Sequence, residues 1–180
     1  MLKITIPNTE QWDEENNVFI ETKGQTIQLE HSLVSISKWE SKWHKPFLNN
    51  ENKTSEELLD YIKCMTITQN VDPNLYIAIS QDIMKKISDY INDSMTATWF
   101  SEKDDGQSNG KIVTSEIIYY WMITLNIPVE FQKWHINRLL TLIKVCSIEN
   151  SPKKKMGKKE AINRNKALNK ARRQAMHSRG

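Results

Sequence analysis

The sequence predicts a mainly helical protein of the α+β class: one helical domain with a small N-terminal antiparallel β element and a basic C-terminal helical tail. Three observations support this prediction. Residues 1–30 contain short runs rich in Ile, Val and Thr, which are typical of strands. Apolar residues then recur every three or four positions, as on one face of a helix. The end of the chain is strongly basic. We therefore divide the chain into 1–30, 31–150 and 151–180, and the first two parts are expected to form one domain.

The N-terminal β element is expected to contain two or three short antiparallel strands. The candidate strands are LKITI, VFIET and TIQLE. Lys23 and Gly24 lie between the last two of these runs. Because Gly is common in the tight connections of hairpins, we expect VFIET and TIQLE to pair with each other.

The helical body is expected to begin after His31 and to contain several amphipathic helices. In the first helix, five apolar residues are spaced so that they share one helical face. These are Leu33, Ile36, Trp39, Trp43 and Phe47. This helix should end near Pro46, because proline does not continue a helix. Thr54 and Glu57 have the spacing of a capping box, which predicts the start of a second helix. A later helix follows Ile83, Ile87 and Ile91, whereas LYIAIS before it is compatible with either a strand or a helix start.

The most apolar part of the chain follows the polar segment 101–111, which is expected to be an exposed loop. Thr114 or Ser115 can cap a helix through EIIYYWMITL. This helix is hydrophobic almost all round, so we expect it to be deeply buried. The next helix should begin at Pro128 and continue to about Cys146, and the two should pack together at the centre of the core.

The net charge of +3 conceals two parts of opposite charge. Residues 151–180 contain 11 basic residues and the single acid Glu160, a net charge of +10, which leaves −7 for the other 150 residues. The longest apolar run, IIYYWMITLNIPV, has 13 residues and is too short to span a membrane. The N-terminus lacks the pattern of a signal peptide, so we expect a cytoplasmic protein. Cys64 and Cys146 are expected to be buried free thiols.

The sequence gives no indication of an enzyme. It contains no Gly-rich phosphate loop, metalloprotease motif or nucleophile elbow, and its four His and two Cys lack metal-ligand spacing. A thiol nucleophile would need Cys64 or Cys146 beside a histidine, and neither lies at a helix start, where its pKa would fall. We therefore expect no catalytic residue, no bound metal and no cofactor.

Trp39 and Trp43 form a candidate partner-binding surface, because they lie one helical turn apart with Lys38 and Lys42 in a parallel row beside them. The alternative is that both indoles belong to the core. We favour that alternative because Leu33 and other apolar residues continue the same row. The group of Trp134, His135 and Arg138 presents the same two alternatives, and apolar neighbours again favour packing.

The basic tail is a candidate contact surface of a different kind. Its helix-forming composition has only a narrow apolar stripe, which is typical of a helix that becomes ordered against an acidic partner. The charge suits nucleic-acid phosphates or an acidic protein surface, including a second copy of this chain. The candidate residues are Lys153, Lys154, Lys155, Lys158, Lys159, Arg164, Lys166, Lys170, Arg172, Arg173 and Arg179.

Several long segments, in the same order, resemble the tail assembly chaperones of long-tailed, siphovirus-like bacteriophages. The segments are LEHSLVSISKWESKWHKPFL, TSEELLDYIKCMTI, YINDSMTATWF, TSEIIYYWMITLNIPVEFQKWHINRLLTLIKVC, SPKKKM and RNKALNKARR, which together cover the chain from about Leu29 to Arg179. The family has no catalytic or ligand motif to carry over.

The resemblance implies a non-catalytic assembly factor in the host cytoplasm. Such chaperones bind the tape measure protein and keep it soluble while tube subunits polymerise around it. Other phage tail proteins and self-association are further expected contacts. Two alternatives remain at this point: a nucleic-acid-binding protein that uses the basic tail, and a structural virion component such as a tail or connector subunit.

Overall fold

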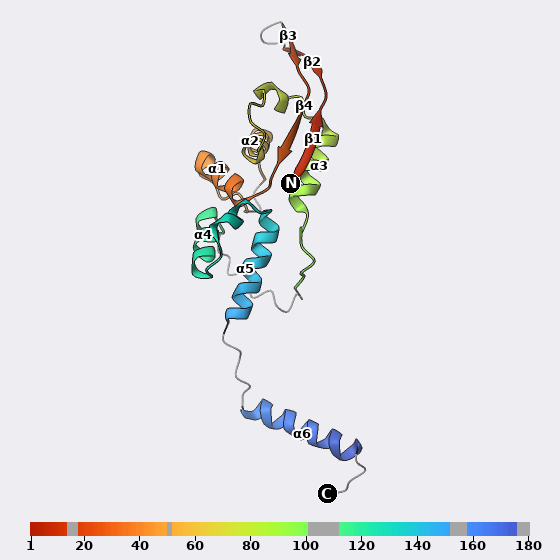
Figure 1. Ribbon diagram of the computed structural model, residues 1–180, viewed down its shortest axis with the longest axis vertical. Coiled ribbons are helices and arrows are strands. Elements are labelled where there is room, and N and C mark those ends of the chain that lie inside the picture. The colour runs from red at the N-terminus through yellow and green to blue at the C-terminus, as the bar shows by residue number, and fades with distance from the viewer. Residues whose placement is uncertain (14–17, 50–51, 101–111, 152–157, 176–180) are drawn as a thin grey trace. The chain divides into compact units, whose positions relative to one another are not determined.

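The computed structural model describes residues 1–13, 18–49, 52–100, 112–151 and 158–175 (Figure 1). Its contacts divide the chain into two compact units, Met1–Ile148 and Glu149–Gly180. The described part is mainly α-helical, with a small antiparallel β element at the N-terminus and a helix in the basic tail, so the predicted fold class is confirmed. The predicted loop 101–111 lies outside the described residues.

The β element is a ribbon in which one pair of strands follows the other. β1 (Leu2–Ile6) pairs with β4 (Gln25–Leu29), and β2 (Thr9–Asp13) pairs with β3 (Val18–Thr22). Figure 1 shows β2 and β3 continuing the ribbon away from the helices. The predicted pairing of VFIET with TIQLE is therefore wrong, and the strand Thr9–Asp13 was not predicted.

Gly24 lies where a hairpin turn was predicted, but the chain there continues from β3 into β4, and these two strands do not pair with each other. A Cβ atom at this position would lie 2.6 Å from the backbone nitrogen of Asn8 and 2.7 Å from the carbonyl oxygen of Ile6. The Gly24 amide donates a hydrogen bond of 2.6 Å to Oδ1 of Asn8. The glycine is thus required by a close approach between two neighbouring strand connections, and no hairpin turn is made there.

The core lies between the β1–β4 pair and the helices. Alternate residues of the two strands, Ile4, Ile6, Ile27 and Leu29, are buried. The second edge of β4 is occupied by the chain that follows α2 (Ser55–Met65). There the Glu30 amide donates to the Met65 carbonyl at 2.9 Å, and the Ile67 amide donates to the Gln28 carbonyl at 2.8 Å. β4 therefore has hydrogen-bond partners on both sides.

The first three α-helices begin at side-chain caps. Ser32 caps α1 (Leu33–Trp43), Thr54 caps α2, and Ser80 caps α3 (Gln81–Asn92). The predicted capping box is confirmed, because Thr54 accepts from the Glu57 amide and the Glu57 carboxylate accepts from the Thr54 amide at 2.7 Å. LYIAIS is neither a strand nor a helix start. Its first two residues end the 3-10 helix η1 (Pro73–Tyr76), and its last is the cap of α3.

The apolar C-terminal part of the body differs from the prediction in two ways. The expected helix from Pro128 to Cys146 is divided into the 3-10 helix η3 (Val129–Lys133) and α5 (Ile136–Asn150). The interruption coincides with an isolated β-bridge between Ser32 and His135. α4 (Ser115–Thr124) is not deeply buried, because only three of its residues are buried, namely Ser115, Ile118 and Met122.

Glu40 joins three parts of the body. It is a buried residue of α1. Its Oε1 accepts a hydrogen bond from the Phe47 amide and its Oε2 accepts one from the Ser115 amide, both at 2.8 Å. The second amide belongs to the first turn of α4, where backbone N–H groups have no partner within the helix. One carboxylate therefore fixes the start of α4 and the segment after α1 relative to each other.

The second unit contains α6 (Lys158–Ala175). The side chains of residues 162–174 are exposed. They include five cations and no acid: Arg164, Lys166, Lys170, Arg172 and Arg173.

Candidate protein-binding surface

The structure places Trp39, one of the candidate partner-binding residues, in the core, which is the alternative that the sequence favoured. Its side chain is 1% exposed, and its Nε1 donates to the Glu57 carbonyl at 2.9 Å. Trp39 also stacks on Trp43 and meets the ring of Phe47 edge-on. Trp39 is therefore a core residue between α1 and α2, and it cannot contact a partner from this position. The repeating apolar row that it shares with Leu33 was the signal for this placement.

The other three residues of that predicted surface lie near the rim of the core. Trp43 is half-buried and donates from Nε1 to Oδ2 of Asp60 at 2.9 Å, while Lys42 donates from Nζ to Oδ1 of the same carboxylate at 2.5 Å. Burial raises the pKa of Asp60, but these two hydrogen bonds and the positive charges of Lys42 and Lys63 together lower the pKa overall. Lys38 is exposed. The structure thus brings Lys42 and Trp43 together on an acid of α2 and gives them an internal role.

The group of Trp134, His135 and Arg138 is also divided between surface and core. The Arg138 guanidinium lies over the Trp134 ring, 4.0 Å from its centroid, and Trp134 stacks on Phe131 with centroids 4.2 Å apart. His135 is buried. Arg138 is exposed, so it is the part of this stack that faces solvent most openly.

A buried group of titratable side chains lies where β4 meets α5. Nδ1 of His31 is hydrogen-bonded to the hydroxyl of Tyr61, and the His31 and His135 rings are 5.0 Å apart. Nε2 of His135 donates to the Tyr90 carbonyl at 3.0 Å, because its Nδ1 accepts from the Asn137 amide. Burial, and secondarily the neighbouring His135, lowers the pKa of His31 to about 3.

This group is internal to the fold. His31 and His135 are 2% and 5% exposed, so no substrate can reach either ring. The hydroxyl of Tyr90 donates to Oε1 of Glu30 at 2.6 Å, which completes a network across β4, α2, α3 and α5. The network positions secondary-structure elements and provides no accessible acid and base.

The surroundings of Cys64 do not activate its thiol. Both Cys64 and Cys146 are free, as predicted, although they are half-buried and not fully buried. Burial, and then the charge of Asp60, raises the pKa of the Cys64 thiol, which disfavours the reactive thiolate. Among the described residues, no three His, Cys, Asp or Glu side chains are grouped as metal ligands would be.

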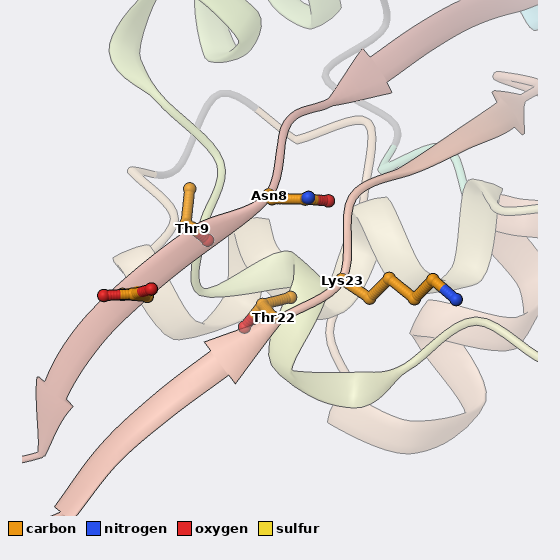
Figure 2. A pocket seen from close by; sticks show the side chains of 5 residues that line it. Asn8, Thr9, Thr22 and Lys23 are labelled. Atoms are coloured by element: carbon orange, nitrogen blue, oxygen red, sulfur yellow. The ribbon is translucent and has the colours of Figure 1, made fainter.

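A polar cavity lies where the β ribbon passes from its first pair of strands to its second (Figure 2). Its volume is about 590 Å³ and its lining includes Asn8, Thr9, Glu10, Thr22 and Lys23. The lining contains hydroxyls, an amide, one acid and one base, with no histidine or cysteine. Asn8 is already bound to the Gly24 amide. The residues present do not form a nucleophile and base pair.

An apolar groove lies between α4 and α5, and it was not predicted. Its volume is about 630 Å³. The α4 side contributes Tyr120, Trp121, Thr124 and Leu125, and the α5 side contributes Leu140, Ile143, Lys144, Ser147 and Ile148. Tyr120 is 62% exposed and Ile148 is 47% exposed. We refer to these nine residues as the α4–α5 groove.

The apolar sequence of α4 was the signal for this groove, but it was interpreted as evidence that the whole helix is buried. A helix that is apolar all round usually lies inside a core. In α4 only the side with Ile118 and Met122 is buried, whereas Ile123 on another side is 75% exposed. α4 therefore has more apolar residues than buried positions, and some of these apolar side chains lie on the surface.

The structure describes only some of the predicted contact residues of the basic tail. Lys153, Lys154, Lys155 and Arg179 lie outside the described residues, and Lys158 and Lys159 belong to the first turn of α6. The five cations between Arg164 and Arg173 are exposed on that helix. The structure thus presents these five cations on one α-helix.

No helix in the described part of the chain has both the length and the apolar character needed to cross a membrane. Comparisons with protein-family models, with curated proteins and with solved structures find no match to this chain.

Proposed function

We propose that this chain is a bacteriophage tail assembly chaperone or assembly factor that binds the tape measure protein in the host cytoplasm and catalyses no reaction. The observation that carries the proposal is the α4–α5 groove, an apolar surface that two helices leave open. The resemblance of the segments between Leu29 and Arg179 supplies the identity of the partner. A tape measure protein is long and helical, and its apolar helix faces need cover until tube subunits surround them.

Co-expression with the tape measure protein encoded by the same phage tests this proposal. We expect the tape measure protein to remain soluble and to co-purify with a tagged copy of this chain. Tyr120→Glu places a charge in the groove and should abolish co-purification. Ile123→Glu is the matched control, because Ile123 is an exposed apolar residue of the same helix that does not line the groove.

The proposal fails if the tape measure protein is soluble without this chain and never co-purifies with it. Mass spectrometry of purified virions provides a second measurement. A chaperone that leaves before maturation should be absent or present in traces. Stoichiometric amounts would instead support a structural tail or connector subunit.

Nucleic-acid binding through α6 is the second candidate function. It is favoured by the five exposed cations of that helix, which lie between Arg164 and Arg173. Binding of this kind neutralises phosphates and weakens steeply with salt. Binding to double-stranded DNA and to RNA should be measured at about 50 mM and about 200 mM salt, with and without residues 151–180. Absence of binding at the lower salt concentration would exclude this function.

A further inference from the structure

A small pocket with two basic side chains lies beside the start of α5. Its volume is about 210 Å³. Lys133 at the end of η3 and Arg138 in α5 line it, and both side chains are exposed. Met95 and Trp134 contribute half-buried apolar surface to the same lining. None of these residues lines the α4–α5 groove, so the two surfaces are separate. We refer to this pocket as the Arg138 pocket.

An aromatic stack holds the guanidinium of Arg138 in place. Its Cζ lies 4.0 Å from the centroid of the Trp134 ring, and the centroid of the Phe131 ring lies 4.2 Å from that of Trp134. Two groups at these distances cannot share one face of an indole, so Arg138 and Phe131 cover opposite faces. A guanidinium that stacks through its face keeps the N–H donors in its plane available for paired hydrogen bonds.

The same stack excludes one class of ligand. Because both faces of the Trp134 ring are covered, the ring cannot stack on a nucleobase or on another aromatic ligand. Recognition in this pocket therefore depends on the positive charges and on the donors of Arg138.

Glu30, the acid in the lining, is already bonded within the fold. Its Oε1 accepts from the Tyr90 hydroxyl at 2.6 Å, and its Oε2 lies 3.1 Å from the amino group of Met1. In the described part of the chain, no ion pair joins Lys133 or Arg138 to a carboxylate. The Arg138 pocket therefore presents two cations to an anion from outside the fold.

The position of Glu30 favours an anion with a single charge. A phosphate that carries two negative charges would be repelled by Glu30 more strongly than a carboxylate that carries one. The two oxygens of a carboxylate also match the planar donors of Arg138. Met95 and the edge of the Trp134 ring can cover a short apolar stem, because contact with apolar surface removes the stem from water.

We propose that the Arg138 pocket binds a carboxylate carried on a short apolar stem. Arg138 makes the paired hydrogen bonds to the carboxylate, and Lys133 adds a second positive charge. The site is independent of the proposed function, because neither the α4–α5 groove nor α6 takes part in it.

Titration of the full-length, ¹⁵N-labelled protein with sodium pentanoate tests the proposal by NMR. The indole N–H signal of Trp134 is identified as the signal that Trp134→Phe removes. We expect pentanoate to shift this signal with a dissociation constant on the order of 1 to 10 mM. Pentanol, which has the same length and no charge, should give no saturable shift. Inorganic phosphate at equal ionic strength should bind at least about fivefold more weakly than pentanoate.

Three variants assign the binding to these side chains. Arg138→Gln should weaken pentanoate binding at least about tenfold, and Arg138→Lys, which keeps the charge but not the planar donors, about three- to fivefold. Lys133→Gln should weaken it about threefold. Lys86→Gln is the matched control, because it removes an exposed cation of α3 that does not line the pocket, and it should leave the dissociation constant unchanged.

Urea denaturation of each variant shows whether it folds, so that lost binding is not confused with lost structure. A pentanoate titration that does not saturate by about 50 mM would overturn the proposal. An equal effect of pentanol, tighter binding of phosphate, or an unchanged dissociation constant in folded Arg138→Gln would do the same.

Discussion

At the scale of single residues, the buried histidine His31 makes folding sensitive to pH. Its pKa is about 3 in the folded protein, against about 6.5 in an unfolded chain, so the unfolded state binds more protons between these values. The free energy of unfolding is therefore highest above pH 6.5 and falls as the pH decreases. The His31 contribution amounts to about 2 kcal/mol lost by pH 5. Burial also lowers the pKa of His135, which adds to the loss in the same direction.

Urea denaturation between pH 5 and pH 7.5 measures this dependence. His31→Phe should lower stability at neutral pH, because Tyr61 loses its partner, but it should also make the pH dependence shallower. A wild-type protein that is equally stable at both pH values would contradict the prediction. The sequence contained no local sign of this network, since its members come from four elements distant along the chain.

Glu40 is the second residue whose removal should be costly. Glu40→Ala leaves the amides of Phe47 and Ser115 buried without an acceptor, and we expect a loss of about 2 to 4 kcal/mol. Glu40→Gln keeps one acceptor oxygen and should have an intermediate effect. Thermal or chemical denaturation gives the values. Glu56→Ala, at an exposed acid on α2, is the control and should change stability by less than about 0.5 kcal/mol.

At the scale of elements, local signals in the sequence were sufficient where the determinant was also local. The capping box of α2 requires only Thr54 and Glu57, and both its start and its cap were predicted correctly. The pairing of β1 with β4 was not predicted, because its residues are far apart in the sequence. Leu2 pairs with Leu29, and both strands of the β2–β3 pair lie between them along the chain. The exposure of α4 was also missed, since an apolar sequence does not indicate which of its faces the rest of the chain covers.

Gly24 provides a test of the ribbon. Gly24→Ala would place a Cβ atom within 2.7 Å of backbone atoms of residues 6–8. Backbone cannot move aside as a flexible side chain does, so we expect a loss of about 1 to 3 kcal/mol in the free energy of unfolding. Lys23→Ala, at the exposed neighbour, should have little effect. Equal stability of the two variants would show that the strand connections can separate without cost.

At the scale of the whole molecule, the core belongs to one part of the chain. Every buried apolar residue in the described regions lies between Ile4 and Ile143. Deletion of residues 151–180 should therefore change the free energy of unfolding of the body by less than about 0.5 kcal/mol. Urea denaturation of the full and shortened chains tests this expectation. A clear decrease in stability would show that the basic tail contributes to the fold of the body.

The position of β4 predicts that amide hydrogens of the β1–β4 pair and of the β2–β3 pair exchange with deuterium at different rates. Both edges of β4 are hydrogen-bonded, to β1 and to the chain after α2, and Ile27 and Leu29 are fully buried. Its amide hydrogens should exchange with deuterium only when the whole body unfolds. β2 and β3 have only each other within the described sheets, so their amides should exchange earlier through local opening. A single exchange time course would then reveal a slow and a fast half within one continuous ribbon.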